Sequence, residues 1–472
     1  MIHLENTYAD LPRDFFQDVT PSSAVKPELL AFNAPLAEAL GLTLSDRSAG
    51  ELAALFSGKT LPDGARPIAM AYAGHQFGNF VPQLGDGRAI LLGEVVDGGG
   101  RRFDIHLKGA GQTRFSRGGD GRSSLGPVIR EYLVSEAMHA LGIPTTRALA
   151  AVATGEVVYR ERALPGGVLA RVASSHLRVG TFEFFAARRQ TDHLRVLADY
   201  AIARHDPALR DADEPYLELF RAVARRKLAL VARWMGVGFI HGVMNTDNTS
   251  IAGETIDFGP CAFMDTFRHD QVFSSIDHQG RYRYRSQGQV AIWNLAALAN
   301  CLVPLVAADP SVAVEKLNAE VDALSEVFDR AWLAVMAAKL GIFEPRDDDR
   351  GLIQTWLDHL ERHELDFTLS FRALADGPDA RSPFHQAWRA RLAEQPQTYA
   401  EAFALIKQRN PAIIPRNHQI ERAIEGALHG DLAHFQRLHL ALASPYTDSP
   451  EAAELAAPPR PHEVVQATFC GT

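Results

Sequence analysis

The chain has 472 residues, and 48 Lys and Arg against 57 Asp and Glu give it a formal net charge of −9. Hydrophobic residues make up 46% and charged residues 22%, a balance that excludes a disordered or collagen-like chain and allows a large buried core. The acidic balance, with no long Lys/Arg block, argues against nucleic acid or an anionic membrane as the main partner, but it leaves room for a local cationic pocket.

The sequence pattern in the first part of the chain changes near residue 66. Residues 1–65 are predicted to be mostly helical, because PELLAFNAPLAEALGL places apolar residues at helical spacing. From Pro67 to about Gly111, short runs rich in Gly, Val and Ile predict strands, with RAILLGEVVD and RRFDIHLKGAG joined by a tight turn at 98–100. A loop dense in Gly, Ser and Arg follows up to Pro127.

An amphipathic helix is predicted over Val128–Leu141, because Gly142 and the proline two residues beyond it form a typical helix end. Three further strands are expected after this helix, at 145–153, 156–162 and 167–172. Beyond residue 176 the pattern becomes mostly helical, and the longest helices are expected at 182–204, 214–235, 290–307 and 312–340.

Residues 238–265 interrupt the helical region, and two short strands flanking a loop are expected there. The stretch Val290–Ala308 is long and apolar enough to be considered as a membrane span, but Asn294, Asn300 and Pro304 interrupt it. A buried core helix is therefore the prediction for this stretch.

The predicted fold class is α+β, with a mixed α/β lobe followed by a large, mostly helical lobe. The expected boundaries are an N-terminal helical extension at 1–65, an α/β lobe at 66–175, a helical lobe at 176–445 and a C-terminal tail at 446–472. The tail is rich in Pro and Ala from Ser444 onward and is expected to run over the surface.

Four features follow one another in the order that a phosphoryl-transfer site needs, and the first two are a lysine and a glutamate. Lys108 ends the apolar strand DIHLKG, and a charged group there needs a partner or a ligand. Glu131 lies 23 residues later, one turn into the predicted helix, where it can hold the lysine and leave its ammonium facing phosphate oxygens. The alternatives are a strand-end lysine that reaches water and a solvated glutamate.

The third feature is HGVMNTDN, residues 241–248, followed by TIDFG, residues 255–259. The carboxylates of Asp247 and Asp257 and the amide of Asn248 are oxygen ligands of the kind that Mg²⁺ prefers, and a carboxylate beside the metal can act as a base. The alternative is a plain hairpin in which Asn and Asp form the turn.

The fourth feature is the sequence Gly-Asp-Gly-Arg, which occurs at 85–88 and again at 119–122. Each copy can present backbone N–H groups and an arginine to an anion, although both are equally compatible with tight turns. Neither copy is a Walker loop or a kinase G-x-G-x-x-G loop. Arg171 and Arg178 are placed to clamp a polyphosphate, the alternative being surface arginines with buried stems.

These motifs together resemble the selenoprotein O family of protein adenylyltransferases over about residues 70–285. The matching segments are GHQFGNFVPQLGDGRA, DIHLKGAGQTRFSRGGDGRSSLGPVIREYLVSEAM, LARVASSHLRVGTFE, HGVMNTDNTSIAGETIDFGPCAFMD and DHQGRY. The resemblance implies a protein-kinase-like, two-lobed fold that binds ATP in a flipped orientation. It also implies transfer of AMP to Ser, Thr or Tyr hydroxyls of protein substrates, with release of pyrophosphate and with Mg²⁺ or Mn²⁺ as cofactor.

The resemblance also implies roles for individual residues. Asp247 would accept the proton, Asn248 and Asp257 would ligate the metal, and Lys108 would contact phosphates while paired with Glu131. The residues expected to bind ATP are Gly85, Gly87, Arg88, Lys108, Asp120, Gly121, Arg171, Arg178 and Asp257.

Two other functions remain as alternatives, a kinase and a catalytically silent, nucleotide-binding pseudokinase. In a protein kinase the base is the Asp of His-Arg-Asp, five residues before the metal-binding Asn, and that position here is Val243, which cannot accept a proton. Asp247 is then the remaining carboxylate in reach. The expected partners are ATP and protein substrates, with no nucleic acid and no membrane.

The three cysteines, Cys261, Cys301 and Cys470, are too few and too scattered for a disulfide framework or a four-ligand zinc site. The N-terminus shows neither a signal peptide nor a transit peptide, so a cytoplasmic protein is expected. Some eukaryotic relatives of the resembling family carry selenocysteine near the C-terminus. Cys470 is therefore a candidate redox residue with Cys261 as its partner, the alternatives being an inert tail thiol and a packed small residue.

Overall fold

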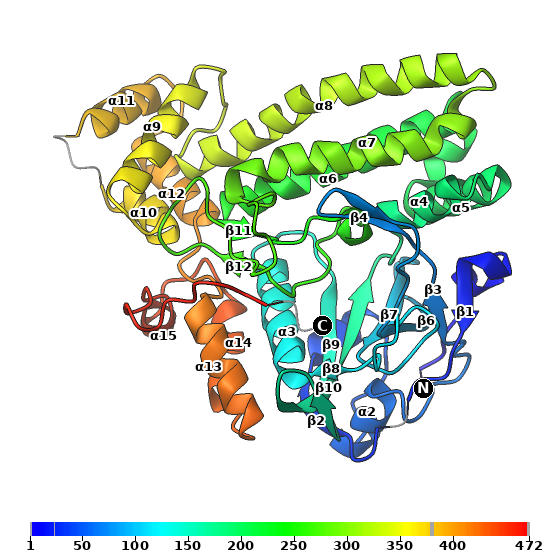
Figure 1. Cartoon of the computed structure of the whole chain (residues 1–472). Helices are drawn as coiled ribbons and strands as arrows, with labels where there is room; N and C mark the ends of the chain where they lie inside the picture. The colour runs from blue at the N-terminus through cyan, green and yellow to red at the C-terminus, as the bar shows by residue number, and fades with distance from the viewer. Residues whose placement is uncertain (1, 23, 378–381, 470–472) are drawn as a thin grey trace.

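An antiparallel sheet organises the N-terminal part of the chain in the computed structural model, which describes residues 2–22, 24–377 and 382–469 (Figure 1). Its strands lie in the order β1-β3-β6-β7-β10-β9-β2, and β8 pairs with β10. The strands are β1 (Phe16–Asp18), β2 (Glu28–Phe32), β3 (Ile68–Met70), β6 (Ala89–Val96), β7 (Arg102–Lys108), β8 (Ser123–Ser124), β9 (Arg147–Tyr159) and β10 (Ala163–Ala173).

Strands β6 and β7 form the predicted hairpin at the centre of this sheet. Ala89 pairs with Lys108 at one end and Val96 with Arg102 at the other. The turn is held by Asp97, whose carboxylate accepts hydrogen bonds from the backbone N–H groups of Gly99 and Arg101. This hairpin places Lys108 at the end of a strand whose neighbours on both sides are also strands.

The prediction of a mostly helical segment over 1–65 is wrong at two places. Strand β1 pairs with β3, and β2 pairs with β9, so this segment supplies both edges of the sheet. The apolar run ELLAF at β2 is compatible with either period, and pairing with a distant strand decides its conformation. Among the described residues of this segment, only α1 (Ala34–Ala39) and α2 (Ala49–Phe56) are α-helices.

Helices cover both faces of the sheet. On one face, Leu52 and Phe56 of α2 pack in a cluster with Leu92 and Leu107 of the sheet. On the other face, α3 (Leu125–Ala140) buries its apolar side chains in a separate cluster. Helices α13 (Asn417–Leu428) and α14 (Ala433–Leu442) pack against α3 from the far side, as Figure 1 shows.

The second half of the chain is mostly helical, as predicted. The expected helix at 182–204 is two helices, since the chain turns at Arg189, which has a φ of +56°. The remaining helices are α4 (Val179–Ala187), α5 (Thr191–His205), α6 (Pro215–Gly236), α7 (Gln287–Val306), α8 (Pro310–Lys339), α9 (Asp349–Arg362), α10 (Phe367–Ala373), α11 (Pro383–Ala393), α12 (Tyr399–Arg409) and α15 (Pro450–Leu455).

Two small hairpins complete the fold. Strands β11 (Phe239–Ile240) and β12 (Ala262–Phe263) enclose the loop that carries the predicted metal ligands, as expected for residues 238–265. Strands β4 (Gly74–Gln76) and β5 (Asn79–Val81) form a separate pair that reaches across to the helical part (Figure 1).

The apolar segment that was considered as a membrane span is helix α7. The helical segment Tyr284–Val306 contains an 18-residue window with a mean hydropathy of 1.6. The segment is therefore long and apolar enough to cross a membrane by length and composition, but 56% of that window is buried inside the structure. Leu295 and Leu302 are fully buried in the largest core cluster, against residues of α6 and α8. The packing of α7 is that of a core helix.

The C-terminal tail is more closely packed than expected. Leu455 of α15 is buried in the cluster around α3, and Thr468 donates its hydroxyl to the carbonyl of Pro260 at 2.6 Å. Arg416, fully buried, holds the same region through the carboxylates of Asp265 and Asp366. At Thr468 the tail therefore lies beside the loop between β11 and β12.

Lys227 of α6 provides a test of the helical core, because it is buried without a carboxylate partner in the described part of the chain. Its ammonium lies 4.5 Å from the ring centre of Trp234, and burial lowers its pKa to about 7. The unfolded chain holds this proton up to a higher pH, so unfolding is favoured more strongly as pH falls from about 10 to 7. We expect Lys227→Met to stabilise the protein at pH 8.

The measurement is the free energy of unfolding from urea titrations of both proteins at several pH values. The advantage of Lys227→Met is expected to shrink by about 1.4 kcal/mol for each pH unit between about pH 8 and 10. A difference that stays constant over this range would show that the lysine is charged in the folded state.

Candidate active site

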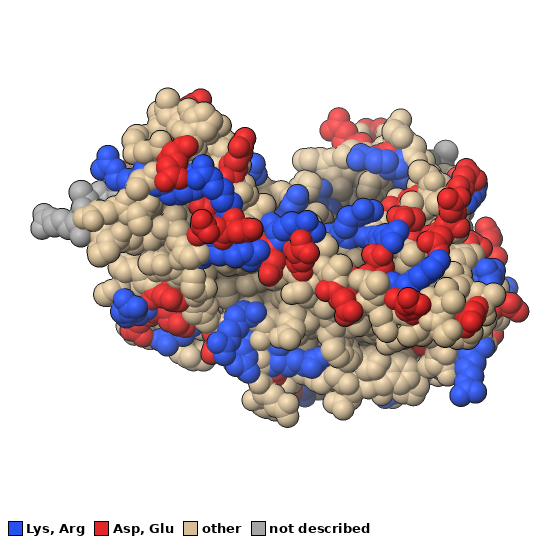
Figure 2. Space-filling model, turned by 90° about the horizontal axis from the view of Figure 1, so that it is seen from above, with Lys and Arg blue, Asp and Glu red and all other residues tan. Residues whose placement is uncertain are grey.

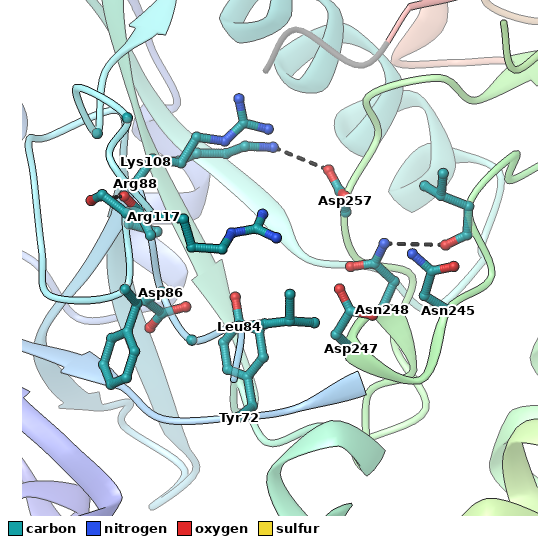
Figure 3. A pocket seen from close by; sticks show the side chains of 18 of the residues that line it. Tyr72, Leu84, Asp86, Arg88, Lys108, Arg117, Asn245, Asp247, Asn248 and Asp257 are labelled. Carbon is teal, nitrogen blue, oxygen red and sulfur yellow. Dashed lines mark hydrogen bonds and ion pairs between the residues drawn. The ribbon is translucent and has the colours of Figure 1, made fainter. Parts of the chain in front are cut away.

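A cavity of about 410 Å³ lies between the sheet and the helical part of the chain (Figure 3). Each residue that the sequence analysis assigned to ATP, metal or proton transfer lines it. These residues are Gly85, Gly87, Arg88, Lys108, Asp120, Gly121, Arg171, Arg178, Asp247, Asn248 and Asp257. They come from segments up to 172 residues apart, counted as 257 − 85, so the fold rather than the local sequence brings them together.

A four-residue ion cluster forms the inner end of the cavity. The Lys108 Nζ lies 2.6 Å from Glu131 Oε2 of α3 and 3.2 Å from Asp257 Oδ1. Arg171 Nε, on β10, donates to Glu131 Oε1 at 2.8 Å. Glu131 is thus held by two cations, which leaves Lys108 directed at Asp257 and the cavity, as Figure 3 shows.

The charges of this cluster decide the protonation of its carboxyl groups. Burial raises the pKa of Glu131, but Arg171 and Lys108 outweigh burial and hold the pKa below its usual range. Burial also raises the pKa of Asp257, but Lys108 and Arg88 outweigh burial and hold this pKa well below its usual range. Both carboxylates are therefore ionised at neutral pH.

The two Gly-Asp-Gly-Arg segments form one wall of the cavity, and their glycines are required sterically. Gly85 has a φ of +74°, and a Cβ there would lie 2.3 Å from the ring of Phe115. Gly121 has a φ of +66°, and a Cβ there would lie 2.1 Å from the carbonyl oxygen of Gly111. The two loops therefore approach other chain segments more closely than any other residue type allows.

The aspartates of the two segments each hold an arginine. Asp120 makes a two-pronged pair with Arg160, at 2.9 and 3.0 Å. Asp86 is fully buried and accepts from the backbone N–H of Met70. A guanidinium nitrogen of Arg178 lies 3.6 Å from Asp86, which orients Arg178 along the cavity wall.

Asp86 was not predicted as a site residue, although it lies inside the first glycine motif. Burial would raise its pKa, but His106 and Arg178 outweigh burial and lower the pKa to about 2. The sequence around Asp86 favours a turn. Its function as an anchor depends on His106, which lies on β7, and on Arg178, which directly precedes α4. Other lining residues that were missed include Tyr72, Arg117, Arg160 and Asn245, whereas Arg122 belongs to the second predicted Gly-Asp-Gly-Arg motif.

Asp247 and Asn248 face the cationic wall from the opposite side, on the loop between β11 and β12 (Figure 3). Gln76 donates to Asp247 Oδ2 at 3.2 Å, and Oδ1 has no hydrogen-bond partner in the described structure. Burial raises the pKa of Asp247 to about 6, against the opposing effects of Gln76 and Arg178. A buried carboxylate oxygen without a donor is suited to accept a proton or a hydrogen bond from a ligand.

The donor set for a metal is small. Asn248 Nδ2 donates to the carbonyl of Val243 at 3.1 Å, which fixes the amide and leaves its oxygen for another partner. Asp257 has a φ of +67°, a conformation that Asp and Asn adopt more readily than other side chains. No group of three or more His, Cys, Asp or Glu residues suited to a metal occurs among the described residues. Two oxygen ligands fit Mg²⁺ or Mn²⁺ when phosphate oxygens complete the shell.

The two cysteines considered for redox chemistry are placed differently. Cys261 is a free, buried thiol, and burial raises its pKa to about 12. A thiol with so high a pKa is unreactive as a nucleophile at neutral pH. Cys470 lies outside the described residues.

Charge on the outer surface is mixed. On the face shown in Figure 2, many Lys and Arg lie close to Asp and Glu, with uncharged surface between these groups. The cavity lining differs, since it combines Arg88, Lys108, Arg117, Arg171 and Arg178 with fewer acidic residues. A concentrated positive field at a concave site favours a polyanionic ligand of small size.

Comparisons with known proteins agree with these features. The family model described as "Protein adenylyltransferase SelO" matches residues 1–443. A protein nucleotidyltransferase YdiU of Rhizobium etli (strain CIAT 652) is 55% identical over 99% of this chain and 97% of its own length. Proteins of the same name from Bradyrhizobium diazoefficiens and Rhizobium meliloti (strain 1021) are each 54% identical over 99% of both chains.

Proposed function

The chain belongs to the SelO family of protein adenylyltransferases, a nucleotidyltransferase family that transfers AMP onto proteins, and from this membership we propose how its cavity performs the transfer. The observation that carries the proposal is the position of the Lys108 Nζ, between Glu131 at 2.6 Å and Asp257 at 3.2 Å in a cavity that also contains Asp247. This arrangement supplies a phosphate-binding cation, a metal ligand and a proton acceptor within one cavity.

The triphosphate of ATP lies along the cationic wall. Arg88 and Lys108 bind its oxygens, while the pairing of Arg178 with Asp86 keeps that guanidinium at the same wall. Arg171 donates its Nε to Glu131, so it positions the carboxylate that holds Lys108 in addition to contacting the ligand. The glycines at 85, 87 and 121 let the two loops pack closely on Phe115 and Gly111, which shapes the wall that faces the nucleotide.

Asn248 and Asp257 would hold Mg²⁺ or Mn²⁺ together with phosphate oxygens. The fit rests on their hard oxygen donors and on the ionised state of Asp257. When bound, such an ion neutralises charge on the phosphates and on the departing pyrophosphate.

Asp247 accepts the proton of the acceptor hydroxyl. The oxygen of a Ser, Thr or Tyr side chain attacks the α-phosphorus, the bond from the α-phosphorus to the bridging oxygen breaks, and pyrophosphate leaves with the bonding electrons. The hydroxyl proton passes to Asp247 Oδ1, the buried oxygen without a donor in the described structure. Lys108 and Arg88 stabilise the charge that develops on the phosphates.

The architecture that supports this chemistry is kinase-like in two respects. A lysine on a sheet strand is paired with a glutamate on the following helix, and a loop with Asp-Asn precedes the Asp-Phe-Gly segment. The place of the kinase base is taken by Val243, which is buried and apolar. The absence of a base at this position argues for AMP transfer over γ-phosphoryl transfer. We also propose a cytoplasmic location, with ATP and proteins as partners.

The test uses two preparations of ATP, labelled at the α- or at the γ-phosphate, with Mg²⁺ or Mn²⁺ and a protein acceptor such as casein. Label is expected to enter protein only from the α position. Label from the γ position alone would make the protein a kinase with a relocated base, and ATP binding without transfer of either label would support a silent pseudokinase.

A further inference from the structure

A second recess, of about 490 Å³, lies beside the catalytic cavity and is separated from it by strand β4. We name it the hairpin groove, and its lining includes His75, Phe80, Glu183, Trp293, Ala297 and Asn300. Successive side chains of a strand point to opposite faces, so Gln76 lines the catalytic cavity while His75 lines the groove. One strand therefore forms a wall of both.

The groove is tied to the loop that carries Asp247. The backbone N–H of His75 donates to Thr246 Oγ1 at 2.6 Å, and the Thr246 hydroxyl donates to Glu183. Glu183 also accepts from the ring of His75. Thr246 directly precedes Asp247, so the groove wall and the proton acceptor are fixed in one hydrogen-bonded unit.

The interior of the groove presents aromatic surface to solvent. Phe80 is 41% exposed and Trp293 is 37% exposed, and the His75 ring lies between them, with ring centres 5.0 and 5.1 Å away. Clustered exposed aromatic side chains rimmed by polar groups are typical of a protein-binding surface.

Two arginines lie next to residues that line the groove. The guanidinium of Arg281 lies 4.9 Å from the ring centre of Trp293, and Arg188 donates to the carbonyl of Pro82, next to β5. Neither arginine forms an ion pair with a carboxylate in the described part of the chain. Two cations without carboxylate partners beside an apolar recess are complementary to a segment that carries both an apolar and an acidic side chain.

We propose that the hairpin groove binds the acceptor protein, by taking an apolar side chain that lies near the modified hydroxyl while an acidic side chain of the same segment pairs with Arg188 or Arg281. The inference rests on the proposed function, because AMP transfer requires a polypeptide to bring its hydroxyl to Asp247. The groove and the catalytic cavity share β4 as a wall, and Thr246 ties β4 to the loop that carries Asp247. It thereby determines which proteins are modified.

The test uses a library of synthetic peptides, each with one fixed Tyr or Ser and randomised flanking positions, incubated with α-labelled ATP. The wild-type protein is expected to favour peptides that carry an apolar and an acidic residue. Trp293→Ala and Phe80→Ala are expected to lower kcat/KM for these peptides by about 10- to 100-fold, the effect of losing burial of one apolar side chain. The double variant Arg188→Gln/Arg281→Gln is expected to remove the acidic preference and to leave the apolar preference unchanged.

The matched control is Tyr399→Ala, which removes an aromatic side chain of similar exposure on α12, far along the helical part. Calorimetry with ATP tests whether each variant still folds and binds nucleotide. Labelling without an apolar or acidic preference, or a preference that survives in Trp293→Ala, would overturn the groove proposal.

Two further outcomes separate the groove from the reaction. A change of oligomeric state in Trp293→Ala, measured by sedimentation, with peptide preference unchanged would identify a second copy of this chain as the occupant and would overturn the proposal. Failure of the wild-type protein to transfer α-label to any peptide or to itself would instead overturn the assigned reaction, and the groove proposal with it.

Discussion

Replacing Asp257 by Asn is expected to lower AMP transfer by about 10²- to 10³-fold, because the change removes one negative charge where the phosphates and the metal meet. Asp257 is the partner of Lys108 at 3.2 Å, and it is ionised in the folded protein. Without the carboxylate, a divalent ion keeps only neutral ligands from the chain. Activity that remains is expected to need a much higher concentration of Mg²⁺ or Mn²⁺.

Asn is a better replacement here than Ala. Asp257 has a φ of +67°, and Asn tolerates this left-handed conformation whereas Ala adopts it only with strain. The loop is thus expected to keep its conformation in Asp257→Asn. A loss of activity in this variant then reports on the charge alone.

The measurement is initial rate of α-label transfer as a function of metal concentration. The control is Asp309→Asn, which also removes one carboxylate but at the N-cap of α8, where Asn caps equally well. We expect the control to retain full activity and an unchanged metal dependence. If Asp257→Asn kept more than a tenth of the wild-type rate at the same metal concentration, Asp257 would not be a metal ligand.

The parts of the site that could be predicted are those determined by short, local stretches of sequence. Lys108 ends a strand and Glu131 lies in the first half of the helix that follows, and packing of that helix on the sheet brings the two together. The loop at 238–265 was likewise predictable, because apolar residues on both sides of HGVMNTDN mark two short strands.

The parts that could not be predicted depend on contacts between distant segments. Strands β1 and β2 pair with β3 and β9, and nothing local distinguishes these short apolar runs from helix turns. Asp86 has a turn sequence around it, and only the approach of His106 and Arg178 makes it an anchor. The analogy with protein kinases predicted the order of the site residues along the chain, but it did not predict these contacts.

The hairpin groove is a further example. Phe80 and Trp293 are 213 residues apart, counted as 293 − 80, and each alone is an ordinary aromatic residue in a sequence. They form one surface because β5 lies against α7 through His75. Acceptor recognition is consequently a property of the tertiary structure, and no motif along the chain indicates it.

Replacing Asp247 by Asn is expected to lower kcat by about 10²- to 10⁴-fold and to leave the affinity for ATP nearly unchanged, which is the pattern for loss of a general base. Asn has the same shape, and the absence of a Cβ at Gly74 leaves room for it, since a Cβ there would lie 2.6 Å from Asp247 Oδ1. Gln76 can still donate to the amide oxygen. The variant therefore lacks the ability to take a proton and little else.

Two measurements separate this effect from that of Asp257. Calorimetric titration with ATP and Mg²⁺ is expected to give similar affinities for wild type and Asp247→Asn, whereas single-turnover transfer of α-label to casein is expected to be slow in the variant at every metal concentration. A fall in ATP affinity with an unchanged rate at saturation would place Asp247 in nucleotide binding. An unchanged kcat would assign the proton to solvent. The other carboxylate of the loop between β11 and β12 that lines the cavity is Asp257, and because Lys108 lowers its pKa, Asp257 is a weak base.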